Sequence, residues 1–75
     1  MCLGMPMKIV EKLDEVHAVA EALGARRTIN IMATPDVKIG EYVMVHAGMA
    51  ISKVEKKEAE EALKIWSELM NIWNG

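Results

Sequence analysis

Residues 42–46 read Tyr42-Val43-Met44-Val45-His46, a run that is apolar on both faces of an extended strand until its final histidine. A strand of this kind is typical of a central position, where neighbouring elements cover both of its faces. Ala47-Gly48 then interrupts the pattern, and residues 49–52 resume it. We therefore predict two strands separated by a turn.

Three further strands are predicted upstream of this pair. Residues 7–13 alternate lysines with Ile9 and Leu13, which places those two side chains on one half-buried face. Residues 16–23 form a second run, although its alanines would also suit a helix, and residues 27–31 alternate again in β-branched residues. Five short strands in so small a chain predict a closed or nearly closed antiparallel barrel, which avoids exposed edges.

Turn residues separate these runs. Asp14-Glu15 supplies a polar turn, and Thr34-Pro35-Asp36 is a second turn, because proline presets φ and aspartate can bond the local backbone. Arg26 and Arg27 follow the break at Gly24. We interpret these arginines as part of a solvated turn, with contact to an acidic partner as the alternative.

The hydrophobic period changes after residue 54. Apolar side chains then recur at helical spacing and fill about half of the helix circumference, with charged and polar residues on the other half. This pattern predicts an amphipathic α-helix over residues 55–75 that begins near Lys56. The apolar arc is wider than contact with one small barrel requires, so we expect some of Trp66, Ile72 and Trp73 to be available to a partner.

Length and composition limit the functional classes. With 75 residues, the chain can form only one core, so we predict a single domain made of a tip (1–6), a barrel (7–54) and a helix (55–75). A formal net charge of −2 gives no electrostatic reason to expect nucleic acid or an anionic membrane as the partner. One cysteine excludes an internal disulfide, and no apolar run reaches the length of a membrane span. These features predict a cytoplasmic protein.

The single cysteine, Cys2, is the candidate nucleophile or metal ligand. A lone cysteine is usually a small buried hydrophobe, but a position next to the chain start favours exposure, and an exposed thiolate binds soft metals. Gly4 and Pro6 give it a stiff exit into the first strand. His46 is the second candidate ligand, with a hydrogen-bonded structural histidine as the alternative, whereas His17 is interpreted as a surface residue. Two ligands do not close a zinc site, so any metal would be shared with another protein.

Two segments of the sequence resemble known signatures. Met1-Cys2-Leu3-Gly4-Met5-Pro6 resembles the amino-terminal signature of the HypC/HupF family of NiFe-hydrogenase maturation chaperones, and residues 40–51 are similar to that family's second signature. The order, the length and the terminal helix also agree, so the resemblance covers essentially the whole chain. It implies an OB-like β-barrel followed by a C-terminal helix, which is the fold class that the periodicity predicts.

The resemblance further implies a function and a set of site residues. The implied function is a non-enzymatic chaperone that works with the HypD scaffold protein while iron acquires its cyanide and carbonyl ligands. The chaperone then helps deliver this transient iron centre to the hydrogenase large-subunit precursor. Cys2 matches the family's functional cysteine and His46 the histidine of the second signature, which makes both possible iron ligands. The positions around the thiol are matched by Leu3, Gly4 and Pro6.

Two positions depart from the family pattern, and both concern the contact surface. Met7 stands where a glycine is common, and Met49 stands where an aromatic residue is common. Together with Met5, these side chains would provide an adaptable interface for successive partners, because methionine is flexible and polarisable.

Two other functional classes remain open from the residues alone. An OB-type nucleic-acid-binding module would use a basic groove with stacking aromatics, whereas Tyr42 is the only aromatic residue of the barrel region. A thiol enzyme would need acid–base partners, and His46 is the only candidate.

Overall fold

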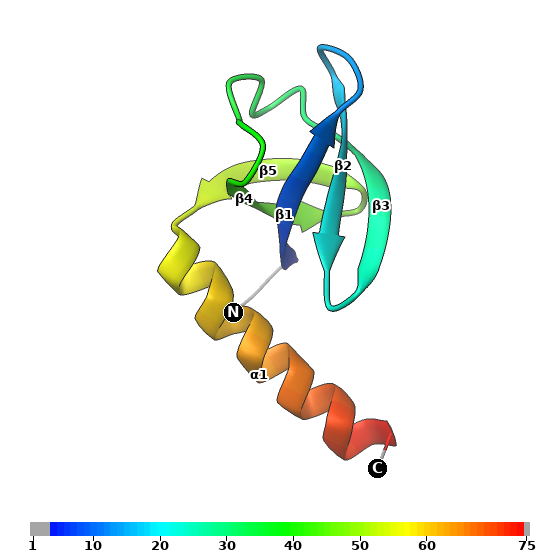
Figure 1. Cartoon of the computed structure of the whole chain (residues 1–75), viewed down its shortest axis with the longest axis vertical. Helices are drawn as coiled ribbons and strands as arrows, with labels where there is room; N and C mark the ends of the chain where they lie inside the picture. The colour runs from blue at the N-terminus through cyan, green and yellow to red at the C-terminus, as the bar shows by residue number, and fades with distance from the viewer. Residues whose placement is uncertain (1–3, 75) are drawn as a thin grey trace.

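The computed structural model describes residues 4–74, which form five strands and one C-terminal helix (Figure 1). The strands close into a barrel in the order β1-β2-β3-β5-β4. The predicted fold class is therefore confirmed, and the strand predicted at residues 42–46 has those bounds. The elements are β1 (Met5–Lys12), β2 (His17–Ala22), β3 (Ala25–Asn30), β4 (Tyr42–His46), β5 (Met49–Val54) and α1 (Lys56–Asn74).

One pair of neighbouring strands runs parallel. β3 and β5 pair in parallel at Asn30 and Met49, whereas the four other neighbouring pairs are antiparallel. The predicted antiparallel barrel therefore has one parallel seam, for a geometric reason. Around a closed ring with an odd number of strands, directions cannot alternate at every step, so at least one pair of neighbours must run parallel.

β1 begins at Met5 and contains Pro6. The prediction that Pro6 lies in a tip before the first strand is therefore wrong. The first half of β1 pairs with β4, and pairing with β2 starts only at Lys8. The backbone N–H of Ile9 donates to the backbone oxygen of Glu41, on the edge of β1 that faces β4. Because successive backbone N–H groups of a strand point to opposite edges, the nitrogen of Pro6 points to the edge that faces β2. Because pairing on that edge has not yet begun at Pro6, the missing N–H breaks no ladder hydrogen bond.

A β-bulge changes the end of β1. Ile9 pairs with Ala20 and Glu11 with Val19, which leaves Val10 as the extra residue. An extra residue reverses the alternation of side chains beyond it. Leu13 follows the end of the strand and is 49% exposed. The prediction that Leu13 shares the buried face of Ile9 is therefore wrong.

Two-residue turns connect the β2–β3 and β4–β5 hairpins. Leu23 and Gly24 have φ values of 52° and 82°, and Ala47 and Gly48 have 52° and 80°. Positive φ at both central residues is the conformation that joins antiparallel strands with little splay. Because β3 starts directly after Leu23-Gly24, Arg26 and Arg27 both lie in the strand. The predicted strand at 27–31 is therefore confirmed for Arg27, and the interpretation of the two arginines as a solvated turn is wrong.

The barrel core is small and aliphatic. β2 contributes alanines, which leave room for branched side chains from the other strands. Val37 comes from the connection between β3 and β4 and is fully buried, so this connection closes one end of the barrel. The largest fully buried side chains are Ile9, Ile29, Ile31, Val37, Val43 and Pro6.

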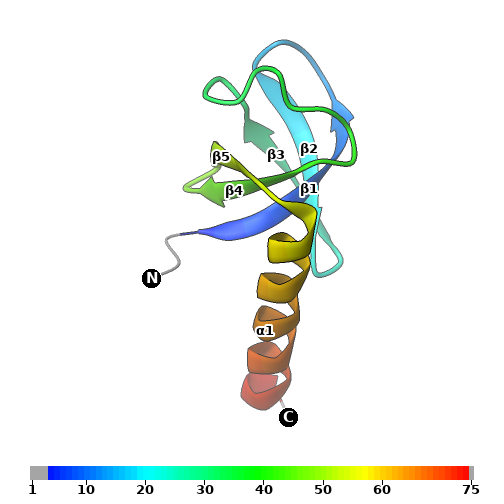
Figure 2. The ribbon, with the colours of Figure 1, turned by 90° about the vertical axis from the view of Figure 1, so that its left-hand side faces the viewer.

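α1 begins at Lys56, as predicted, and extends away from the barrel (Figure 2). Ala59 in its first turns is fully buried, and Leu63 packs partly against the core. Farther along, Ile72 is 78% exposed, which confirms the expectation of unused apolar surface there, while Trp66 is partly buried. The side chain of Trp73 lies outside the described part of the chain. Within residues 4–74, no helix combines the length and the apolarity needed to span a bilayer.

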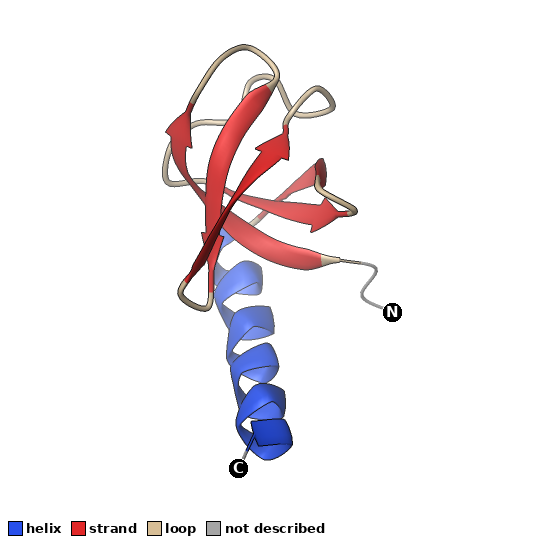
Figure 3. Ribbon diagram, turned by 90° about the vertical axis from the view of Figure 1, so that its right-hand side faces the viewer, coloured by secondary structure: helices blue, strands red, loops and turns tan. Residues whose placement is uncertain are grey.

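Figure 3 shows that the helix begins beneath the middle of β1 and beside the turn between β2 and β3, while the start of β1 lies off to one side of the helix. At that start, the pairing of β1 with β4 brings residues of both signature segments together.

Candidate functional site

A close backbone contact joins Gly4 to the end of β4. A β-carbon placed on Gly4 would collide with the backbone oxygen of Val45, and it would lie 2.9 Å from that residue's carbonyl carbon and 3.4 Å from the Cβ of His46. Both of the nearest atoms belong to the backbone and cannot rotate aside. Only glycine therefore fits at this position.

This contact brings the two signature segments together. Gly4 and Pro6 belong to the first segment, and Val45 and His46 belong to the second. The pairing of Met5 with Val45 continues outward to place Gly4 beside His46. Cys2 and Leu3 lie outside the described residues, so the structure positions Gly4, Pro6 and His46 but not the thiol.

His46 ends β4 at the barrel surface. It is exposed and pairs with Met49 across the Ala47-Gly48 turn. Its side chain is therefore accessible at the rim of the barrel. Among the described residues, no three histidine, aspartate or glutamate side chains gather closely enough to hold a metal ion.

A cavity of about 370 Å³ lies next to this contact. Its size falls within the range of small ligand pockets, about 300–1,000 Å³. Met5 and Val45 line it and are the direct chain neighbours of Gly4 and His46. We call it the methionine groove, and its lining residues are Met5, Met7, Ala22, Leu23, Ala25, Arg27, Val45 and Met70.

The predicted methionine interface is only partly exposed. Met49 is 38% exposed and Met5 is half-buried, so both can contact another molecule. Met7 is only 5% exposed and belongs mainly to the core, although one side of it forms part of the groove wall. Met5, Met7 and Ile9 share one face of β1, so the exposure of Met5 and Met7 differs because Met5 lies at the start of the strand and Met7 lies nearer the core.

Comparison with known proteins identifies the family. The model of the HupF/HypC family matches residues 1–66, which include both signature segments. The chain belongs to the HupF/HypC family. The resemblance found in the sequence is confirmed, and membership favours the chaperone hypothesis over the nucleic-acid-binding and thiol-enzyme alternatives.

Several relatives of this HupF/HypC-family chain are similar over most of their length. The hydrogenase maturation factor HypC of Azotobacter chroococcum is 45% identical over 69 residues, covering 92% of this chain and 82% of the relative. HypC of Cupriavidus necator is 38% identical, covering 96% and 80%. The hydrogenase maturation factor HybG of Escherichia coli is 32% identical, covering 84% of each chain.

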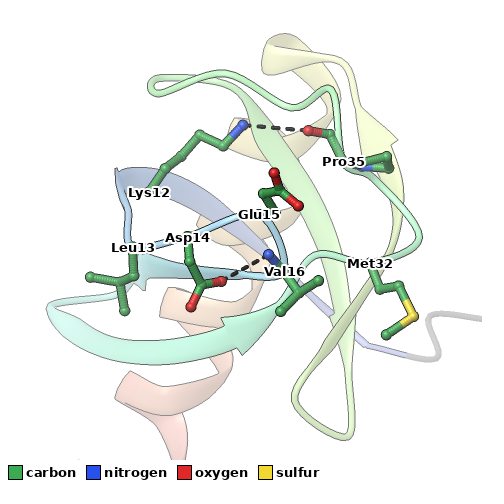
Figure 4. Close-up of a pocket in the computed structure, with 7 residues that line it drawn as sticks. All are labelled: Lys12, Leu13, Asp14, Glu15, Val16, Met32 and Pro35. Atoms are coloured by element: carbon green, nitrogen blue, oxygen red, sulfur yellow. Dashed lines mark hydrogen bonds between the residues drawn. The ribbon is translucent and has the colours of Figure 1, made fainter.

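At the other end of β1, this HupF/HypC-family chain forms polar contacts that were not predicted from the sequence. The Lys12 ammonium donates to the backbone oxygen of Val37 at 3.0 Å and to that of Pro35 at 3.4 Å (Figure 4). These bonds tie the end of β1 to the connection that closes the barrel. The sequence could not predict that Lys12 bonds this connection, because the bulge at Val10 determines which face of β1 the Lys12 side chain occupies.

Asp14 organises the neighbouring turn. Its Oδ1 accepts hydrogen bonds from the backbone N–H groups of Val16 and His17, both at 2.8 Å, and His17 Nδ1 lies 3.1 Å from the same oxygen. The bond from the Val16 N–H is the main reason why the pKa of Asp14 lies below its usual value. His17 is exposed, as predicted, and its bond to Asp14 belongs to this turn.

An ion pair also holds the connection between β3 and β4. Lys53 Nζ lies 3.0 Å from Asp36 Oδ2 and 3.8 Å from Glu41 Oε1. The hydrogen bond between Lys53 and Asp36 lowers the pKa of the aspartate and raises that of the lysine. The pocket at this end has a volume of about 620 Å³ and is lined by Lys12, Leu13, Asp14, Glu15, Val16, Met32 and Pro35 (Figure 4).

Proposed function

We propose that this chain is a non-enzymatic chaperone of NiFe-hydrogenase maturation that acts in the cytoplasm. In this proposal it binds the HypD scaffold protein and the hydrogenase large-subunit precursor in turn, through Cys2. It helps carry an iron centre with two cyanide ligands and one carbonyl ligand between them. Membership of the HupF/HypC family and the names of its relatives, which are hydrogenase maturation factors, support this role.

The observation that carries the proposal is the contact of Gly4 with the end of β4. Cys2 precedes Gly4 by two residues, and each trans peptide unit spans about 3.8 Å between Cα atoms. In this proposal, the short chain between Cys2 and Gly4 allows the thiol to act near His46, which lies beside Gly4. A sulfur and an imidazole could then act on the same bound molecule.

The ligand chemistry suits a cargo that must be passed on. Thiolate sulfur binds soft and borderline metals well, and a neutral imidazole is a common second ligand. A site that contributes one or two ligands leaves the remaining positions to cyanide, carbonyl and the partner protein. The iron centre is then held jointly, and it can leave with the partner when the contact breaks.

Substitution of the thiol tests the proposal directly. Cys2→Ala should abolish complex formation with purified scaffold protein and with purified precursor, and the far-ultraviolet circular dichroism spectrum should not change. Infrared bands of cyanide and carbonyl should also disappear from material isolated with the variant. If Cys2→Ala binds both partners and supports normal hydrogenase maturation, the thiol has no part in the mechanism.

The two histidines provide a matched pair for the second ligand. His46→Ala should reduce the iron-linked infrared bands while the melting temperature stays close to that of the wild type, because exposed residues contribute little to stability. His17→Ala, which alters an exposed histidine of the Asp14 turn, should leave the bands intact. A large loss of melting temperature in His46→Ala, with unchanged bands, would assign this histidine a structural role.

A further inference from the structure

The methionine groove contains one charged side chain among apolar ones. Seven of its eight lining residues are methionine, alanine, leucine or valine, and the eighth is Arg27. Arg27 is exposed and makes no hydrogen bond or ion pair with any described residue. A guanidinium beside an apolar wall can offer paired donors to a carboxylate without breaking an existing contact.

The neighbouring arginine shows that this arrangement is specific to one face of β3. Arg26 Nε donates to Glu21 Oε2 at 3.1 Å, so its charge already has a partner on β2. Successive residues of a strand point to opposite faces, which explains why Arg27 lines the groove and Arg26 does not. The two arginines therefore differ in environment although they are adjacent in the sequence.

We propose that the methionine groove binds an apolar segment of a partner protein whose acidic side chain pairs with Arg27. The inference rests on the proposed function for the identity of that partner. The groove adjoins the candidate site, because Met5 follows Gly4 and Val45 precedes His46. One partner could therefore contact Cys2 and the groove together, with methionine adapting to the segment's apolar side chains.

The charge pattern decides between classes of ligand. A phosphate or a nucleic-acid backbone is usually bound by several donors, whereas among the described residues Arg27 is the only cation that lines this groove. A single carboxylate beside apolar side chains matches the composition more closely. An acidic residue within a peptide segment supplies both features.

The first test uses intact, purified scaffold and precursor proteins. Arg27→Gln should weaken binding of at least one of them by about tenfold, and Arg27→Glu should weaken it further, because a carboxylate would then face a carboxylate. Arg26→Gln and Arg26→Glu are the matched controls and should change binding by less than about twofold. Equal effects at the two positions would mean that only net charge matters, and would overturn the proposal.

The second test does not depend on those partners. Wild-type protein with ¹³C-labelled methionine methyl groups is titrated with the capped peptide acetyl-Leu-Glu-Leu-amide, and with acetyl-Leu-Gln-Leu-amide as the control. The Met5, Met7 and Met70 signals should shift with the glutamate peptide, while Met32 at the opposite end of the barrel should not. The shifts should be much smaller with the glutamine peptide and in Arg27→Gln.

The two tests separate the possible failures. Shifts that are absent, or that are equal for both peptides, overturn the groove assignment even when the intact partners bind. If the three signals instead move on dilution without peptide, a second copy of the chain occupies the groove and the proposal is wrong. If the wild-type chain binds neither purified partner, the proposed function fails, and the peptide titration still decides whether the groove accepts an acidic apolar segment.

Discussion

The two ends of β1 are stabilised in different ways. At its start, Gly4 lies against the backbone of Val45, and Met5 and Met7 form one wall of a groove with an unpaired arginine. At its end, the Lys12 ammonium bonds two backbone oxygens of the connection between β3 and β4. The first end depends on close apolar and backbone packing, and the second on directional polar bonds.

This difference indicates which end is suited to a partner. Where the polar groups are already bonded to one another, a new ligand must displace existing contacts before it gains any. Around the methionine groove, the side chains are flexible and the guanidinium of Arg27 is unpaired within the described residues. A partner can therefore bind there at a lower cost in broken interactions.

The largest effect is expected at the start of β1. Gly4→Ala should destabilise the fold by about 3 kcal/mol, because the added carbon meets backbone atoms that cannot move without separating β1 from β4. The same variant should also lose partner binding, since a displaced Gly4 would disturb the start of β1 and the methionine groove that adjoins it. Urea unfolding and a pull-down with the purified scaffold protein measure the two effects.

Gly40→Ala is the control for this variant. Gly40 has a φ of 95°, but a β-carbon there meets no atom within 4 Å. The substitution should cost about 1 kcal/mol from backbone strain alone, and it should leave partner binding unchanged. If Gly4→Ala is as stable as the wild type, the pairing at the start of β1 is looser than the structure shows.

The fold was largely predictable because its signals are local. β4 ends at a histidine followed by a turn pair, and the helix starts where the hydrophobic period changes from two to about 3.6 residues. Short-range patterns of this kind determine which elements form. The error at Leu13 comes from the bulge at Val10, which shifts the register by one residue without changing composition. Pro6 was misplaced for another reason, because the sequence does not show that one edge of β1 is still unpaired at that residue.

The site was predictable only in its residue types. Gly4 and His46 were singled out from the two signature segments, but their proximity depends on the register between β1 and β4. Cys2 was singled out in the same way and lies outside the described residues. The roles of Lys12 and Arg27 could not be predicted, because each depends on which strand face the residue occupies. The departures at Met7 and Met49 were visible in the sequence, while their different exposures were not.

A medium effect is expected at the other end of β1. Lys12→Met removes an ammonium that bonds the Val37 and Pro35 oxygens but keeps a chain of similar length. The variant should lose about 1 kcal/mol of unfolding free energy, which is typical of a lost charge-assisted bond near the surface. Partner binding should remain normal, because this end lies away from the methionine groove.

Lys8→Met on the same strand is the control, since Lys8 is exposed and makes no such bond within the described chain. It should change stability by less than about 0.5 kcal/mol. If Lys12→Met weakens partner binding more than stability, the division of roles between the two ends of β1 is wrong.

The smallest effect is a pH dependence at the Asp14 turn. The pKa of Asp14 is lowered mainly by the bond from the Val16 N–H, so its charged form is favoured in the folded state. Its contribution to stability is present above the unfolded pKa of about 3.9 and is lost as pH falls through the lower folded value. Asp14→Asn should therefore be less stable than the wild type near neutral pH, and the difference should vanish in acid.

Unfolding by urea between about pH 6 and about pH 2 measures this difference, with Glu15→Gln as the control. Glu15 is exposed and has no hydrogen bond or ion pair among the described residues, so its substitution should give the same small difference at every pH. A parallel measurement of partner binding should show no change in Asp14→Asn, because the turn stabilises only the far end of β1. A pH-dependent loss of binding in that variant would instead connect the two ends and contradict their separate roles.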